Sequence, residues 1–251
     1  MKTYVINMEK DVQKRMLIEQ QLVKQANLEI VFFKAIEGRK LNREELRNSV
    51  NMDLFKKRYH DFATLPAIGC SLSHWSLYCM MSEAADPYAL ILEDDALLSP
   101  NLACKIGNFE SFLCSDTPTV ILLTPEFVYG LKQEVKATDG LSLYALCGGT
   151  MASGYLINKA GAELLEKNLY PISYLADMWD DFVEMGLKVY GIVPHLVSYP
   201  EGLGEIGRSQ HDSVEKGLYQ KIRYRLAFMK GKVWVFLFVY MKGLRISSKK
   251  W

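Results

Sequence analysis

The sequence lacks the features that mark secreted, repetitive or membrane-spanning proteins. Its five cysteines form no C-x-x-C pair and no Cys/His cluster with metal-ligand spacing, which argues against a disulfide scaffold or zinc module and favours buried free thiols. Its longest apolar run, residues 233–241, has nine residues, whereas a membrane-spanning helix needs roughly 20. The opening residues contain no signal-peptide core, and we therefore expect a cytoplasmic protein.

Net charge is also nearly absent. The 30 basic and 29 acidic residues give +1, so the whole chain offers no argument for a nucleic-acid partner. Residues 216–251, however, contain ten basic residues and no acidic ones, which leaves residues 1–215 with 20 basic and 29 acidic residues, a net charge of −9. We therefore expect one acidic domain over residues 1–215 and a basic, aromatic tail over residues 216–251.

The tail alternates basic and aromatic side chains, a composition that suits the headgroup region of an anionic membrane. We expect a helical tail that holds the protein peripherally on the inner face of the cytoplasmic membrane. Two alternatives stay open: residues 233–241 form a helix that packs on the domain, or the tail binds RNA.

The domain alternates strand and helix patterns, which indicates an α/β fold. A strand at residues 3–7, a helix from residue 11 and a strand at residues 28–33 form a β-α-β unit of the kind that builds a parallel sheet. Further strands are predicted at residues 88–92, 119–123, 141–146 (as a sheet edge), 151–157 and 188–193. Further helices are predicted at residues 44–50, 68–84, 159–167 and 176–185.

Three consecutive carboxylates, Glu93, Asp94 and Asp95, follow the apolar run at residues 88–92. Such a run is typical of a central strand buried on both faces, and open α/β sheets bind ligands beyond the carboxyl ends of their strands. Mg²⁺ or Mn²⁺, which prefer oxygen ligands, would relieve the repulsion between these charges. We expect a divalent-metal site here; the alternative is an acidic turn that caps the next element.

A second acidic group consists of Asp177, Asp180 and Asp181. In a helix over residues 176–185 their i, i+3 and i+4 spacing places them on one face. The alternative is an acidic first turn that complements the helix dipole. Trp179, which lies between them, either faces a sugar or packs in the core.

Residues 66–74 place Gly69, Ser71 and Ser73 at a predicted helix start, where backbone N–H groups can bind an anion. The serines serve equally well as helix caps. His74 is either a hydrogen-bonded structural residue or a ligand-binding one, and it has no Cys or Asp partner in sequence for a nucleophilic triad.

Six segments occur in an order that resembles a known family. They are VINMEKDVQKR at the start, FFKAIEG (32–38), IGCSLSHW (68–75), ALILEDDALL (89–98), SGYLINKAGAELL (153–165) followed by Asp177, and VYGIVPHLV (189–197). Together they resemble the glycosyltransferase family 25 enzymes of lipooligosaccharide biosynthesis, over about residues 1–215. The resemblance implies a GT-A-like fold with one nucleotide-sugar-binding domain, a UDP-sugar donor, a divalent metal at the acidic triplet, and β-linked transfer with inversion.

The resemblance also implies residue roles. Asn7 and Arg15 resemble donor-side residues, Asp94 and Asp95 the metal and ribose ligands with Glu93 in support, and Asp177 an active-site carboxylate. We add Ser71 and His74 to the donor-binding set. The extra acids Asp180 and Asp181 leave the general base open among three aspartates, and residues 199–213 lack a clean match to the family's acceptor-side segment.

The sequence thus predicts an inverting transferase that moves a hexose, with galactose favoured over glucose, from a UDP-sugar to a lipooligosaccharide acceptor, using Mn²⁺ or Mg²⁺. One alternative is a metal-dependent phosphohydrolase that uses both aspartate clusters. The other is a non-catalytic carbohydrate-binding protein on a transferase fold.

Overall fold

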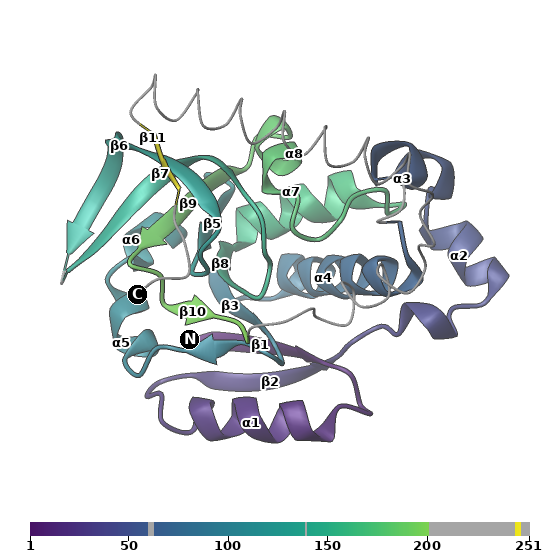
Figure 1. Ribbon diagram of the computed structural model, residues 1–251, viewed down its shortest axis with the longest axis horizontal. Coiled ribbons are helices and arrows are strands. Elements are labelled where there is room, and N and C mark those ends of the chain that lie inside the picture. The colour runs from purple at the N-terminus through teal and green to yellow at the C-terminus, as the bar shows by residue number, and fades with distance from the viewer. Residues whose placement is uncertain (60–62, 139, 201–243, 247–251) are drawn as a thin grey trace, which may run out of the picture.

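The computed structural model describes residues 1–59, 63–138, 140–200 and 244–246, and its centre is a nine-stranded sheet with helices on both faces (Figure 1). The strands of this sheet are β1 (Lys2–Asn7), β2 (Glu29–Lys34), β3 (Tyr88–Glu93), β5 (Thr119–Leu122), β6 (Phe127–Thr138), β7 (Leu141–Gly149), β8 (Gly154–Asn158), β9 (Lys188–Val193) and β11 (Leu244–Ile246). Their spatial order is β11-β6-β7-β9-β5-β8-β3-β1-β2. Two short strands, β4 (Leu97–Leu98) and β10 (Val197–Ser198), pair separately.

The sheet is mixed. β1 is parallel to β2 and β3, and β5 is parallel to β9, whereas antiparallel pairs join β3 to β8, β8 to β5, β9 to β7, β7 to β6 and β6 to β11. These pairings make β1, β2, β3, β5, β6 and β9 run in one direction, six of the nine strands. The predicted α/β class with a mixed, mainly parallel sheet is confirmed.

Two apolar cores, one on each face, hold the helices to the sheet. Side chains from α1 (Val12–Leu22), α5 (Leu102–Gly107) and α6 (Glu110–Leu113) belong to one core. Side chains from α3 (Met52–Tyr59), α4 (Leu65–Glu83), α7 (Lys159–Leu169) and α8 (Trp179–Glu184) belong to the other. The connection from β2 to α3 holds a short 3-10 turn, η1 (Gly38–Lys40), and α2 (Arg43–Ser49).

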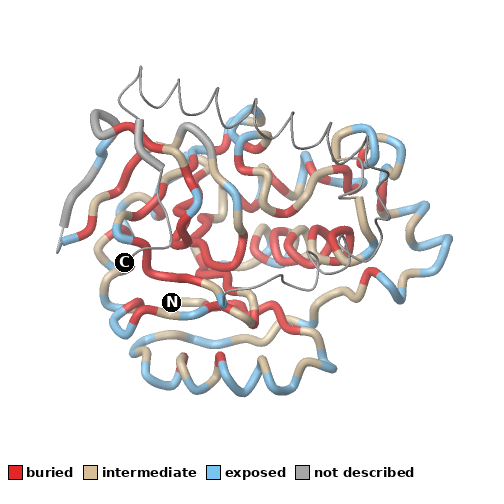
Figure 2. The backbone as a smooth tube through the Cα atoms, viewed as in Figure 1, coloured by how far each residue is buried: buried red, intermediate tan, exposed pale blue. Residues whose placement is uncertain are grey.

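Strand β3 shows why the central strands are apolar throughout. Ala89 and Ile91 point into the core of α4 and α7, whereas Leu90 and Leu92 point into the core of α1 and α5. Because successive side chains of a strand alternate between faces, a strand with helices on both sides must be apolar at every position. Figure 2 shows the resulting band of buried residues through the central strands and along α4.

Helix α4 packs against η1 with almost no space between the backbones. A Cβ atom added to Gly69 would lie 2.4 Å from the Ile36 carbonyl oxygen and 2.5 Å from the Gly38 nitrogen, so only glycine fits here. Ser73 strengthens the contact, because its Oγ donates to the Gly69 carbonyl at 2.7 Å and accepts from the Ile36 N–H at 2.8 Å. This contact fixes which face of α4 is turned toward the end of β3.

Several predictions are wrong in detail. Residues 141–146 do not form an edge strand, because β7 lies between β6 and β9. Strand β6 and helix α3 were not predicted at all, and Cys104 and Cys114 are free but exposed rather than buried. The predicted tail lies outside the described residues, except for Leu244–Ile246, which form a strand beside β6.

Candidate functional site

The acidic triplet lies at the carboxyl end of β3, as predicted, and its members point to opposite faces of the sheet. Glu93 ends the strand and continues the row of Ala89 and Ile91, so it faces α4. Asp94 continues the alternate row and faces α1. The triplet therefore divides into two differently built halves rather than one cluster of equivalent carboxylates.

The α1 half of the site holds Asp94 between an amide and an ammonium group. Parallel pairing of β1 with β3 brings Asn7 beside Asp94, and Asn7 Nδ2 donates to Asp94 Oδ2 at 2.8 Å. Lys14, in the first turn of α1, donates to Asp94 Oδ1 at 3.3 Å. Burial acts to lower the pKa of Lys14, but the charges of Asp94 and Asp95 outweigh it and raise the pKa.

Asp95, the next residue, lacks the kind of side-chain hydrogen bonds that Asn7 and Lys14 give to Asp94 among the described residues. Its Oδ1 is buried and has no hydrogen-bond partner among the described residues. Burial, together with the negative charge of Glu93, raises the pKa of Asp95 to about 6. A buried carboxylate oxygen without a donor fits a cation ligand, because a bound dication would supply the missing positive charge.

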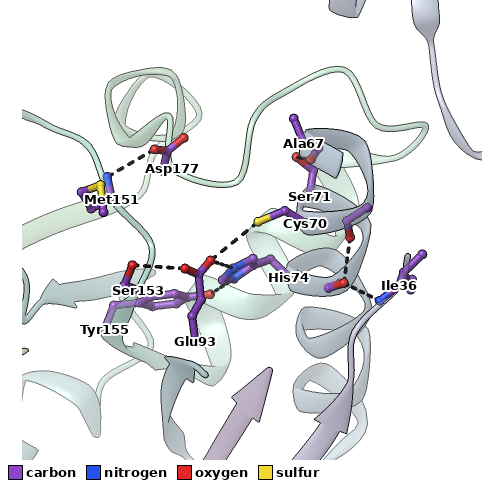
Figure 3. Close-up of polar contacts among 12 residues, drawn as sticks. Ile36, Ala67, Cys70, Ser71, His74, Glu93, Met151, Ser153, Tyr155 and Asp177 are labelled. Carbon is purple, nitrogen blue, oxygen red and sulfur yellow. Dashed lines mark hydrogen bonds and ion pairs between the residues drawn. The ribbon is translucent and has the colours of Figure 1, made fainter. Parts of the chain in front are cut away.

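The α4 half of the site holds Glu93 in a set of hydrogen bonds (Figure 3). Oε1 is 3.4 Å from His74 Nε2 and 3.7 Å from Cys70 Sγ, and Oε2 accepts from Ser153 Oγ at 3.1 Å. Burial acts to raise the pKa of Glu93, but these bonds and the His74 ring outweigh it and hold the pKa below its ordinary value. Glu93 is thus the carboxylate of the triplet that is best stabilised as an anion.

Strand β8 supplies the partners of this half. It pairs antiparallel with β3, so Ser153 comes directly opposite the end of β3 and donates through its hydroxyl to Glu93. Two residues later, Tyr155 lies on the same face, and its hydroxyl is 2.7 Å from His74 Nδ1 and 2.9 Å from the Tyr78 hydroxyl. His74 is buried and joins Glu93 to the two tyrosines.

The second acidic group is not a single helical face. Asp177 precedes α8, so the predicted helix at residues 176–185 begins too early and the i, i+3, i+4 argument does not apply to it. Asp177 Oδ2 accepts from the Met151 N–H at 3.3 Å and Asp180 Oδ1 from the Gly149 N–H at 3.1 Å, whereas Asp181 Oδ2 accepts from the Tyr59 hydroxyl at 2.9 Å.

The charge of the acidic triplet acts on Asp177. Burial raises the pKa of Asp177, and the negative charge of Glu93 raises it further. Burial also raises the pKa of Asp180, but the other charges that act on it are Asp181 and Glu184. Trp179 is completely buried and donates to the Met151 carbonyl, so of the two readings of this residue the core position is the correct one.

Two other predicted donor-side residues, Ser71 and Arg15, contact neighbouring parts of the fold. Thr64 caps α4, which begins at Leu65, three residues before the predicted start. Ser71 is therefore inside the helix, where its hydroxyl donates to the Ala67 carbonyl, and neither Ser71 nor Ser73 is the cap. Arg15 pairs with Glu19 and its guanidinium lies over the Phe32 ring. Lys14, which the sequence analysis did not select, is the α1 residue that contacts the triplet.

Cys70 is a partner of His74 that was not predicted. Their separation of four residues places both on one face of α4, and together with Glu93 they form a group of potential metal ligands. The sequence pattern, interpreted as free of any Cys/His cluster with ligand spacing, thus contains one pair that the fold brings together with a third potential ligand. Its signal was present as the C-x-x-x-H spacing, but the third ligand comes from β3 and is not adjacent in sequence.

The carboxylates at the carboxyl end of β3 have an amide from the end of the parallel strand β1 and a lysine from α1 beside them. This edge of an open sheet is where α/β proteins commonly bind their ligands. The family described as glycosyltransferase family 25 (LPS biosynthesis protein) matches residues 1–180. The chain belongs to this family, and its α/β fold agrees with the GT-A-like fold that the resemblance implies.

A relative from Drosophila pseudoobscura pseudoobscura, named glycosyltransferase 25 family member, is 31% identical over 100 residues, which are 39% of this chain and only 16% of the relative. Among solved structures, LgtC, a galactosyltransferase crystallised with donor and acceptor sugar analogues, aligns at 12% identity over 86% of this chain and 97% of its own, with a TM-score of 0.38. TarS residues 1–349 from S. aureus, in complex with UDP-GlcNAc, aligns at 12% identity over 83% of this chain and 60% of its own, with a TM-score of 0.41.

Proposed function

We propose that the chain is an inverting glycosyltransferase that uses a UDP-sugar donor and a divalent metal ion. The observation that carries this proposal is that carboxylates from distant parts of the chain, the triplet after β3 and Asp177 before α8, lie near one another (Figure 3). Membership of glycosyltransferase family 25 supports sugar transfer over the hydrolase and binding-protein alternatives.

The donor side of the proposed reaction lies at Asp95, Asp94, Asn7 and Lys14. Asp95, with its unpartnered buried oxygen, would hold Mn²⁺ or Mg²⁺, and Asp94 would contact the metal shell or the ribose. A bound dication would neutralise the charge that builds on the diphosphate leaving group. The Lys14 ammonium adds a second positive charge on the same side, and Asn7 fixes the Asp94 carboxylate that holds it.

The acceptor side lies at Asp177. In an inverting transfer the acceptor oxygen forms a bond to C1 of the sugar, the bond from C1 to the diphosphate oxygen breaks, and a base takes the acceptor's proton. We assign Asp177 as this base, because burial raises its pKa toward the range in which a carboxylate removes a proton effectively. We leave Asp180 and Asp181 out of this role, because Asp180 accepts from the Gly149 N–H and Asp181 from the Tyr59 hydroxyl of α3.

We also propose which sugar is transferred and which class of molecule accepts it. We favour galactose over glucose as the sugar and a lipid-linked lipooligosaccharide as the acceptor, in line with the family description. The test is release of UDP from a panel of UDP-sugars with and without an added saccharide acceptor, with Mn²⁺ or with EDTA. Acceptor-dependent release that requires metal supports the proposal, whereas release of phosphate from simple esters or no turnover of any UDP-sugar contradicts it.

Membrane association through residues 216–251 is proposed from composition, because only Leu244–Ile246 of this segment are described. Across the described ranges, none of the helices combines the length and apolar character that a bilayer crossing requires. Truncation would remove β11, so the sharper test is the triple variant Lys221→Gln, Lys230→Gln and Lys232→Gln. Each lysine near an anionic surface contributes about 1 kcal/mol, so binding to phosphatidylserine vesicles should fall about 100-fold; unchanged co-sedimentation would refute the proposal.

A further inference from the structure

A second group of potential metal ligands lies on the α4 side of the site, built from different chemistry than the aspartates. Cys70, His74 and Glu93 each offer one ligand atom, and these atoms all lie within 4.8 Å of one another. We propose that these three side chains bind Zn²⁺ or a similar transition-metal ion. The inference does not depend on sugar transfer, because it concerns the metal alone.

The two distances from Glu93 match the edges of a tetrahedral zinc shell, and the third pair, Cys70 and His74, lies within 4.8 Å. With Zn–S near 2.3 Å and Zn–N and Zn–O near 2.0–2.1 Å, neighbouring ligand atoms lie about 3.3–3.7 Å apart. In this protein Glu93 Oε1 is 3.4 Å from His74 Nε2 and 3.7 Å from Cys70 Sγ. The Glu93–His74 separation is also longer than the roughly 2.7–2.9 Å of a charge-assisted hydrogen bond, so the pair is spaced more like two ligands than like a tight ion pair.

The second polar atoms of His74 and Glu93, which face away from the proposed metal position, are already hydrogen-bonded to other groups. His74 Nδ1 contacts the Tyr155 hydroxyl at 2.7 Å, and Glu93 Oε2 accepts from Ser153 Oγ at 3.1 Å. Metal-binding histidines and carboxylates characteristically have their second polar atom fixed in this way. The His74 ring and the Glu93 carboxylate are therefore oriented toward a common point before any ion arrives (Figure 3).

The protons balance without any redox step. In the metal-free protein the Cys70 thiol donates to Glu93 Oε1, and His74 Nε2–H does so in one of its two tautomers. On binding, Cys70 loses its proton to solvent, and His74 carries its proton on Nδ1, where it donates to the Tyr155 hydroxyl. Either tyrosine hydroxyl of the Tyr155–Tyr78 pair can be the donor, so this chain accommodates the change by turning its hydroxyls. One proton is released per ion, and solvent completes the tetrahedron.

Ligand type would separate this ion from the metal proposed at Asp95. Thiolate and imidazole ligands favour Zn²⁺ and Co²⁺, whereas Mg²⁺ and Mn²⁺ prefer sites made of oxygen. Asp94 and Asp95 offer only oxygen atoms. Excess Mg²⁺ should therefore not displace an ion from the site of Cys70, His74 and Glu93.

The experiment is a titration of the reduced, chelator-treated full chain with Co²⁺, because a cobalt–thiolate bond gives a charge-transfer band in the near ultraviolet. We expect the band to saturate at one equivalent, to persist in excess Mg²⁺ and to disappear when Zn²⁺ is added. Cys70→Ser should abolish the band, whereas Cys79→Ser, the matched control on the same helix, should retain it. Tyr155→Phe removes the group that holds His74 Nδ1 and should weaken binding about 10- to 100-fold.

X-ray absorption on the zinc-loaded wild-type protein tests the same proposal without any variant. One sulfur at about 2.3 Å with nitrogen and oxygen at about 2.0–2.1 Å is the expected first shell. A shell of oxygen and nitrogen alone, the absence of a cobalt–thiolate band, or a band that survives in Cys70→Ser would overturn the proposal. In each of those cases Cys70 and His74 serve only as hydrogen-bond partners of Glu93.

Discussion

Replacing Asp95 with Asn should make the metal-free protein more stable. The Asp95 carboxylate is placed where burial and the charge of Glu93 raise its pKa from 3.8 to about 6. A folded state that raises the pKa of an acid binds its proton more tightly than the unfolded state does. The folded state therefore loses stability as the pH rises from about 4 to about 6, and the whole penalty remains at higher pH.

The expected gain in the free energy of unfolding follows from the change in the pKa of Asp95. About two pH units at 1.36 kcal/mol each set an upper limit of about 3 kcal/mol. Because the shift is shared with Glu93, we expect Asp95→Asn to gain about 1–3 kcal/mol above pH 7, and progressively less toward pH 4. The neutral amide keeps the shape of the side chain while removing the charge, so no cavity offsets this gain.

The assay is urea unfolding in EDTA across this pH range, with Asp116→Asn, at an exposed position, as the control. The control should change the free energy of unfolding by less than about 0.5 kcal/mol. Adding Mn²⁺ and UDP should stabilise the wild type but not Asp95→Asn, by about 2.7 kcal/mol at 100 times the dissociation constant. If Asp95→Asn in EDTA is no more stable than the wild type at any pH, the reasoning about this carboxylate is refuted.

Three further predictions test the site and the fold. Lys14→Gln should weaken UDP binding about tenfold or more in calorimetry, because a hydrogen bond to a charged group contributes about 1.5–3 kcal/mol. The control, Arg15→Gln, affects contacts to Glu19 and Phe32 and should change UDP binding by less than about threefold. A larger loss at Arg15 would instead support the donor role implied by the resemblance. Asp177→Asn should lower kcat about 10²- to 10⁴-fold, whereas Asp180→Asn should lower it less than about tenfold, and equal losses in the two variants would contradict the assignment. The wild-type rate should also fall as the pH drops through the raised pKa of Asp177, since a protonated carboxyl cannot act as the base. Gly69→Ala should destabilise the protein by about 2 kcal/mol or more in urea unfolding, because its Cβ would meet backbone atoms of Ile36 and Gly38. The control, Gly107→Ala, has open space around its Cβ and should be neutral or stabilising. Similar urea midpoints for the two variants would show that α4 can move away from η1.

The strands that the sequence predicted well are those covered on both faces. Residues 88–92 and 120–123 are continuous apolar runs because alternate side chains of β3 and β5 pack into the two cores on opposite faces of the sheet. Strand β6 carries Gly130 and several charged residues, and its register with β7 shifts at three points, so it has neither a continuous apolar run nor strict alternation. Helix α3 buries only Phe55 completely, which leaves too weak a periodic signal to find it.

Within the site, the parts that follow from a strand end were predictable and the parts that depend on helix rotation were not. Glu93, Asp94 and Asp95 had to emerge at the carboxyl edge once residues 88–92 were a central strand. Whether Cys70 and His74 face Glu93 depends on how α4 is turned, and the contact between Gly38 and Gly69 sets that angle. Choosing Lys14 over Arg15 likewise requires knowing how α1 lies on the sheet.

The insertion of β8 between β3 and β5 has a consequence for how the chain is made on the ribosome. Until residues 154–158 emerge, β3 lacks a neighbour on one side, and β5 lacks a neighbour on both sides because β9 emerges later still. Both strands are among the most apolar segments of the protein. Unpaired apolar edges are prone to join other chains, so nascent or truncated products that stop before residue 154 should require chaperones and should accumulate as aggregates. Splitting the gene at this point to express two halves separately should therefore fail, whereas co-expression of a fragment that carries β8 should rescue the first half.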